Sequence, residues 1–124
     1  MGARFIKVSV IYFLIGVVAG LVMGIAEQFQ YTSTHAHINL LGWASLALIG
    51  VIYSVFPEAG NTKLASVQFW LHNIGLPLLI ISMILFANNV LSVGIPTASA
   101  GGLLVIASVV LFVVNVFGKI KART

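Results

Sequence analysis

The segment that decides the fold and the candidate site is residues 34–43, THAHINLLGW. It places His35 and His37 at the start of a long apolar run. Ionisable side chains inside a membrane span are costly, so they mark a functional site by default. On a helix, positions i and i+2 point about 200° apart. The two imidazoles must therefore face two different spaces, and they cannot share one metal as an i, i+4 pair does.

The composition around this segment is that of an integral membrane protein. Of the 124 residues, 60% are hydrophobic and 6% are charged, and the mean hydropathy is +1.16. A soluble domain carries about 25% charged residues, so this chain has too few to cover a surface in water. Four apolar segments approach the roughly 20 residues that cross a bilayer. We predict an all-α membrane protein, a single domain over 1–124, with four transmembrane helices at about 5–26, 35–56, 67–87 and 99–117.

The basic residues predict how these helices are oriented. The net charge of +4 is not a nucleic-acid signal, because the positive charges gather in three places along the chain: Arg4, Lys7, Lys63, Lys119, Lys121 and Arg123. The other two connections contain no Lys or Arg. By the positive-inside rule, both termini are expected on the cytoplasmic side of the membrane. The location that we expect, a bacterial or archaeal inner membrane, does not follow from the charges themselves. His35 and His37 are then expected near the outer face, in the lipid bilayer.

Three glycines, Gly16, Gly20 and Gly24, recur at four-residue spacing in the first span. Small residues at this interval let another helix approach closely within lipid. The alternative is the ordinary tolerance of membrane helices for glycine. The sequence does not tell whether a partner helix would come from the same subunit.

Small and polar residues also follow the two histidines. Asn39 comes four residues after His35 and shares its helix face, and Gly42 continues this stripe. Small residues beneath an imidazole leave room for a flat cofactor, or they let a neighbouring helix close in. Spacing alone favours neither reading. The chain has no cysteine, which excludes disulfides, iron–sulfur clusters and thiolate-ligated haem.

The third span holds a further histidine, His72. At about 1.5 Å per residue, His37 lies roughly 10 Å on the outer side of the bilayer midplane and His72 roughly 7 Å on the inner side. Two axial ligands of one iron need nearly equal depth. We therefore expect His72 to be a buried hydrogen-bonding or proton-accepting group paired with Gln68 or Asn73, with metal ligation as the alternative. Pro96 is expected to open the fourth helix after a loop over 88–98.

Residues 35–88 resemble the tenth and eleventh membrane helices of subunit I of haem–copper oxidases, closest to the cbb3-type and nitric-oxide-reductase branch. The family's tenth helix has His-x-His, small residues and an aromatic-Pro exit, matched here by His35-Ala36-His37, Gly42-Trp43, Gly50, Tyr53 and Phe56-Pro57. Its eleventh helix begins His-Phe-Trp-Leu and continues with Ile-Gly, matched here by Gln68-Phe69-Trp70-Leu71 and Ile74-Gly75.

The resemblance implies roles for the pair. In the family the first histidine ligates the high-spin haem and the second ligates the low-spin haem, on opposite sides of the helix. Carried over, these roles fall to His35 and His37, with Asn39 and Gly42 beside the cofactor. Two departures matter: Gln68 stands where the family has histidine, and His72 is additional. Family subunits have twelve or more helices, and the remaining haem and copper ligands come from helices with no counterpart here.

The family's helices form three arcs of four around three pores, and this chain resembles one such arc. Three copies would recreate a twelve-helix ring, and a cyclic interface of this kind closes naturally at three if the rotation is right. The expectation is a homotrimer with haem b in each interfacial cavity, ligated by His35 of one subunit and His37 of its neighbour.

The expected function is that of a membrane b-type cytochrome. It would transfer electrons to or from an unknown redox partner, or bind a small gas such as O2 or NO. One alternative is an enzyme that reduces oxygen or nitric oxide, which needs an open iron position and a second metal such as copper. Another is a haem-free accessory or assembly subunit of a respiratory oxidase. An electron carrier is favoured over a complete oxidase, because two histidines on each iron leave no open position.

Overall fold

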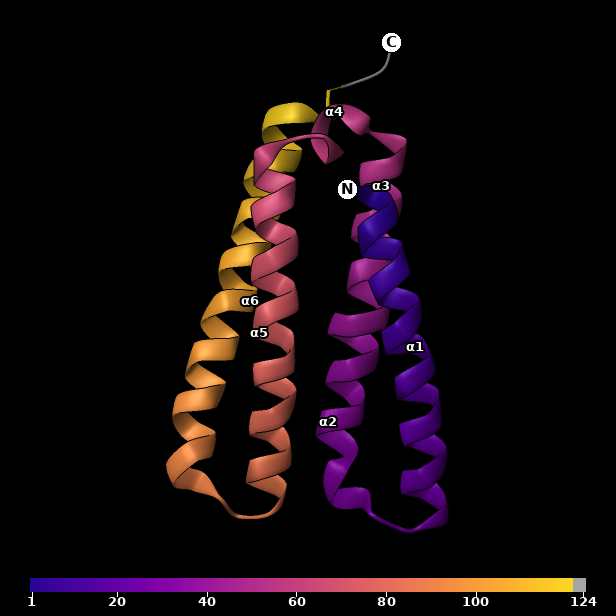
Figure 1. The fold of residues 1–124 in the computed structure, drawn as a ribbon, viewed down its shortest axis with the longest axis vertical. Coiled ribbons are helices and arrows are strands. Elements are labelled where there is room, and N and C mark those ends of the chain that lie inside the picture. Colours follow the sequence, from indigo (N-terminus) through magenta and orange to yellow (C-terminus); the bar gives the residue numbers. More distant parts are fainter. Residues whose placement is uncertain (122–124) are drawn as a thin grey trace.

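The computed structural model describes residues 1–121, in which long helices run alongside one another (Figure 1). The elements are, in order, α1 (Gly2–Ile25), the 3-10 helix η1 (Phe29–Tyr31), α2 (Thr32–His37), the π-helix η2 (Ile38–Ala44), α3 (Ser45–Val55), α4 (Pro57–Gly60), α5 (Lys63–Ala87) and α6 (Leu91–Lys119). Four helical stretches are long and apolar enough to cross a membrane: Gly2–Ile25, Phe29–Val55, Lys63–Ala87 and Leu91–Lys119. The predicted all-α membrane fold with four spans is confirmed for this part of the chain.

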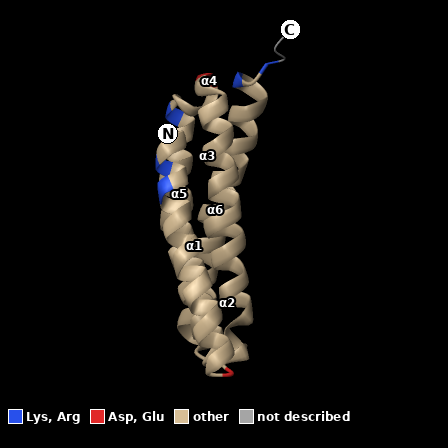
Figure 2. Cartoon of the chain, turned by 90° about the vertical axis from the view of Figure 1, so that its right-hand side faces the viewer, with Lys and Arg blue, Asp and Glu red and all other residues tan. Residues whose placement is uncertain are grey.

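The helices form two pairs. α1 packs along η2 and α3, and α5 packs along α6 (Figure 1). The N-terminus, α4 and the C-terminal end of α6 lie at one end of the molecule, which we call the terminal end, and the α1–η1 and α5–α6 connections lie at the other (Figure 1). The Lys and Arg residues of the described chain lie toward the terminal end (Figure 2). Arg123, which the charge argument also used, falls outside the described residues.

Glycines set the closest approach within each pair. A Cβ atom built on Gly75 of α5 would lie 2.9 Å from the carbonyl oxygen of Gly101 in α6. In the other pair, a Cβ atom on Gly50 of α3 would lie 2.9 Å from the carbonyl oxygen of Gly2 in α1. Lipid gives helices no hydrophobic reason to associate, so backbone contact of this kind is what holds membrane helices together.

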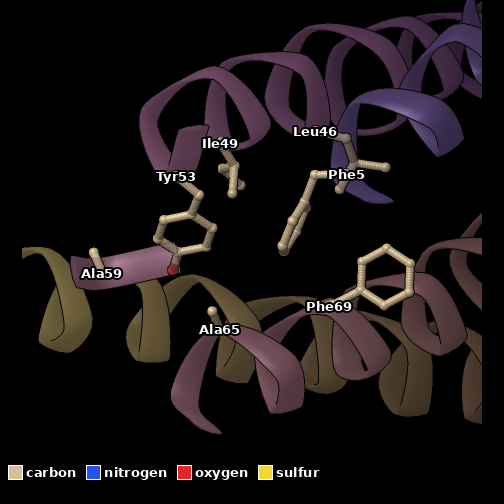
Figure 3. Close-up of a cluster of buried hydrophobic side chains, with 7 residues drawn as sticks. All are labelled: Phe5, Leu46, Ile49, Tyr53, Ala59, Ala65 and Phe69. Carbon is tan, nitrogen blue, oxygen red and sulfur yellow. The ribbon is translucent and has the colours of Figure 1, made fainter. Parts of the chain in front are cut away.

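The two pairs meet toward the terminal end in a buried cluster, Phe5, Leu46, Ile49, Tyr53, Ala59, Ala65 and Phe69 (Figure 3). The Phe5 ring meets the Tyr53 ring edge-on at 5.6 Å and the Phe69 ring at 5.1 Å, which joins α1, α3 and α5. The Tyr53 hydroxyl donates to Gln68 Oε1 and accepts from Asn115 Nδ2 at 3.0 Å. Burial of these polar groups is tolerated because they bond one another.

The fourth helix begins earlier than expected. The predicted loop over 88–98, with Pro96 at the helix start, is wrong, because α6 begins at Leu91. Asn89 makes the connection short by adopting φ 59°, a left-handed conformation that asparagine tolerates. Pro96 then lies inside the helix, near its start, where its missing N–H leaves only the Ser92 carbonyl without the usual donor.

We predict that Gly101→Ala destabilises the protein by about 1–3 kcal/mol, the usual range for overpacking. The new Cβ atom would stand 2.6 Å from the backbone nitrogen of Leu79. Gly102→Ala is the matched control, because a Cβ atom there meets no atom within 4 Å. It should be neutral or stabilising by up to about 1 kcal/mol, since alanine is the better helix former. Unfolding in mixed micelles of increasing SDS content, followed by circular dichroism, measures both changes, and equal effects would contradict the close approach of α5 and α6.

Candidate functional site

The second span contains an irregular turn directly after the histidine pair. His35 and His37 lie in α2, and the helix then widens into η2. At the end of η2 the Ser45 amide donates to the carbonyl of Leu40, five residues back instead of four. The Ser45 hydroxyl donates to the same carbonyl at 2.7 Å. Short π-helical turns within α-helices are frequent at functional sites, and sequence reasoning did not predict this one.

His35 is half-buried and faces α1. A Cβ atom on Gly20 of α1 would lie 2.6 Å from His35 Nε2. The side-chain amide of Asn39 donates to the same Nε2 at 3.0 Å, which places the ring proton on Nδ1. Asn39 in turn fits against Gly16, one turn from Gly20 along α1. The face that carries His35 and Asn39 therefore packs on the glycine face of the first span.

The small residues of the first two spans pack on each other's helices within one chain. Gly16 and Gly20 admit a neighbouring helix of the same chain, whereas a Cβ atom on Gly24 would meet nothing within 4 Å. A Cβ atom on Gly42 would lie 2.6 Å from the ring of Tyr12. The small residue at position 42 thus serves the approach of α1, and Tyr12 fills the space above it.

A cavity of about 450 Å³ borders His35. It lies between α1, η1, α2, η2 and α5, away from the terminal end. Most of its wall is apolar, and a few polar side chains join His35 at its edge; its lining residues are Ala19, Val22, Met23, Gln28, Tyr31, Thr34, His35, Ile38, Ile80 and Ile84. An apolar cavity with a few polar groups, within the common range of about 300–1,000 Å³, is typical of small-molecule and cofactor sites.

His37 has different surroundings. It is half-buried and is not among the residues that line this cavity. Its Nδ1 donates to the backbone carbonyl of Ser33 at 2.9 Å, because a carbonyl can only accept. The proton on Nδ1 leaves the Nε2 lone pair available, and this atom has no hydrogen-bond partner within residues 1–121. A ring held by one nitrogen with the other nitrogen free is the arrangement found in metal-ligating histidines.

His72 is buried, with 1% of its surface exposed. Its Nε2 donates to the carbonyl of Leu41 in η2 at 2.9 Å, and its Nδ1 lies 3.3 Å from the hydroxyl of Ser108 in α6. The ring thus connects α5 with η2 and α6, and it has the buried hydrogen-bonding role that the sequence indicated.

The expected partners of His72 were wrong. Gln68 Oε1 accepts instead from Tyr53, and Asn73 Nδ2 donates to the Phe69 carbonyl within its own helix at 2.8 Å. Spacing along one helix suggested those partners, whereas the actual ones come from two other helices. Gln68 Nε2 is left as a buried side-chain atom without a hydrogen-bond partner in the described part of the chain.

Within residues 1–121 no group of three or more His, Asp or Glu side chains lies together in a way that could hold a metal ion. Haem would need only one or two histidine ligands from the protein for each iron. His37 fits this role as it stands. His35 does not fit it in the present packing, because Asn39 bonds its Nε2 and Gly20 of α1 lies against the same atom, so iron at Nε2 requires α1 to move. The rings diverge, so one copy of the chain does not supply both ligands to one iron.

Comparison with known proteins gives one match of note. The chain is 30% identical over 92 residues to the cbb3-type cytochrome c oxidase subunit CcoN1 of Stutzerimonas stutzeri, covering 64% of this chain and 19% of that subunit. The chain thus spans about a fifth of the length of this relative. No protein-family model matches the chain, and no solved structure matches it. The protein is a multi-pass membrane protein similar to part of a haem–copper oxidase subunit.

We predict that the three histidines differ in their reactivity toward diethyl pyrocarbonate in the metal-free protein. His37 should react fastest because its Nε2 is unpaired. His35 should react more slowly because Asn39 bonds its Nε2. His72 should react at least about tenfold more slowly than His37, because both of its nitrogens are bonded and buried. Mass spectrometry of peptides from the detergent-purified protein measures the three rates. A His72 rate equal to that of His37 would contradict the buried hydrogen bonds.

Proposed function

We propose that this chain is a membrane b-type haem protein in which His35 and His37 are axial ligands, and that it acts in electron transfer or in binding a small gas. The observation that carries the proposal is the setting of His37. Its Nδ1 is held by the Ser33 carbonyl, and its Nε2 lone pair is left unpaired at a half-exposed position on an apolar helix. The similarity to an oxidase subunit supports haem as the group that such an imidazole binds.

The cavity beside His35 supports a second ligand position. Its wall is mostly aliphatic, as a porphyrin face requires, and His35 is among the lining residues. Asn39 holds His35 in the cofactor-free chain, and His35 would serve as a ligand once α1 moves away at Gly20. Gly42 would contribute indirectly by admitting Tyr12. Haem, when bound, supplies reversible one-electron chemistry. The chain supplies two oriented imidazoles and an apolar enclosure.

The divergence of the two rings makes assembly part of the proposal. Each iron would take His35 from one copy and His37 from a neighbouring copy, and three copies would close a ring. The half-exposed position of His37 suits a ligand offered to a neighbour. The grouping of basic residues at the terminal end supports cytoplasmic termini in a bacterial or archaeal membrane. With both axial positions filled, electron transfer is favoured over reduction of oxygen.

One observation favours a second function, that of a haem-free accessory subunit of a respiratory oxidase. His35 already has a packing partner in Gly20 and a hydrogen-bond partner in Asn39 without any cofactor. A packing partner and a hydrogen-bond partner are sufficient for a histidine with a purely structural role. Unlike the haem proposal, this reading gives the unpaired Nε2 of His37 no role.

The visible spectrum of the detergent-purified protein tests the proposal. We expect a Soret band and sharp reduced bands that carbon monoxide does not shift, as in six-coordinate haem. His35→Ala and His37→Ala should each lower the haem per chain at least about tenfold, or leave the iron five-coordinate. Added imidazole should restore the His37→Ala spectrum, because removal of the side chain would leave a space of imidazole size beside the iron.

Asn73→Ala is the matched control, because it removes a polar group that bonds only within α5. It should keep the full spectrum. Native mass spectrometry in detergent counts the subunits and the haems in the same preparation. A wild-type protein expressed with ample haem that shows no Soret band would exclude this proposal and support the accessory role.

A further inference from the structure

We infer that His72 is a positioning residue: its hydrogen bond to the Leu41 carbonyl holds η2 in its π-helical form and thereby fixes the directions of His35 and His37. The importance of those directions for iron rests on the proposed haem function. The effect on helix register does not, and it can be measured by itself.

The first step concerns which N–H group donates to the backbone carbonyls of η2. In a regular α-helix the Ser45 amide would donate to the Leu41 carbonyl, four residues back. Here it donates to the Leu40 carbonyl instead. The Leu41 carbonyl therefore loses its ordinary donor in a segment where lipid supplies no water to replace it. His72 provides that donor, with Nε2 at 2.9 Å from the Leu41 oxygen.

The second step is that the His72 ring is fixed in the form that this bond requires. A carbonyl accepts only, so Nε2 must carry the proton, and Nδ1 then accepts from the Ser108 hydroxyl at 3.3 Å. The ring is 1% exposed, and the Gly75–Gly101 contact brings α6 close to α5 beside it. His72 is thus a neutral donor with a single direction.

The third step concerns register. A π-turn accommodates one residue more than an α-turn, and one residue corresponds to about 100° of rotation about the helix axis. On one side of η2 the helix is anchored in the buried cluster through Leu46 and Tyr53. Converting η2 into α-helix would therefore rotate α2. That rotation would take His35 off Gly20 and turn His37 away from its present direction.

The register can be tested with a cysteine pair, because the natural chain contains no cysteine. Ile38→Cys and Ile84→Cys place thiols on two side chains that line the same cavity, where a short bifunctional maleimide should link them. Adding His72→Met, which removes the donor and keeps an apolar side chain, should lower the yield of this link several-fold. His72→Gln should restore the yield, because its amide can donate from a similar position.

Two further variants make the outcome decisive. Asn73→Ala on the neighbouring position should leave the yield unchanged. Ser108→Ala keeps the imidazole but releases its proton to either nitrogen, so the yield should fall by a smaller factor even if His72→Met folds poorly. An unchanged yield in both His72→Met and Ser108→Ala would overturn the inference.

A separate measurement on the cysteine-free protein connects the register to haem. His72→Met should lower the haem per chain or yield a five-coordinate spectrum, and His72→Gln should recover the wild-type spectrum. If the wild-type protein binds no haem, the proposed function fails while the crosslinking still decides the role of His72. If His72→Met keeps both the haem and the crosslinking yield, the positioning role fails while the proposed function stands.

Discussion

The structure depends on one constraint, which is that backbone N–H and C=O groups within hydrocarbon must find partners inside the protein. The four long helices meet it almost everywhere through their own hydrogen bonds. Pro77 and Pro96 each remove one donor within α5 and α6. A further exception lies in η2, where the Leu41 carbonyl gives up its ordinary donor and takes one from His72 on another helix. That exception lies within a few residues of the histidine pair. The π-helix η2 is held by a hydrogen bond from another span, which distinguishes it from a random local variation in helix geometry.

Small residues determine which polar groups reach one another. The Gly75–Gly101 contact draws α6 onto α5, and the same approach brings Ser108 to the ring of His72. On the other side of the second span, the glycines of α1 receive the side chains of His35 and Asn39. In water, burial of apolar surface would drive this packing, but lipid tails are as apolar as the side chains. Close backbone contact and internal hydrogen bonds therefore take over the role that a hydrophobic core has in soluble proteins.

The sequence predicted the parts of the structure that depend on local composition. The apolar runs located four spans, and the spacing of Gly16 and Gly20 indicated a close helix contact, which the structure assigns to the chain's own second span. The features it missed depend on contacts between segments far apart. The π-helix requires a donor from His72, which is distant in the sequence, so the local pattern of residues 38–44 does not predict the π-helix. Spacing along α5 predicts partners for His72 on its own helix, whereas its actual partners lie on η2 and α6. The proline at position 96 is typical of a helix start and predicts a long connection before α6, whereas the turn at Asn89 is tight enough for the helix to begin before Pro96.

The histidine pair also explains why one chain would hold the ligands of the proposed site without completing it. Positions i and i+2 cannot face the same space, and the structure gives the two rings separate surroundings, with His35 against α1 and His37 held by the Ser33 carbonyl. In the proposed assembly every subunit offers one imidazole on each side, so cofactor binding and subunit association stabilise one another by mass action. Each interface is of the head-to-tail kind, which closes into a ring if the rotation permits and otherwise forms a filament. The angle between the two imidazoles about the helix axis would then set the angle between neighbouring subunits. A hydrogen bond that fixes the register of η2 therefore acts on the geometry of the whole ring as well as on a single ligand.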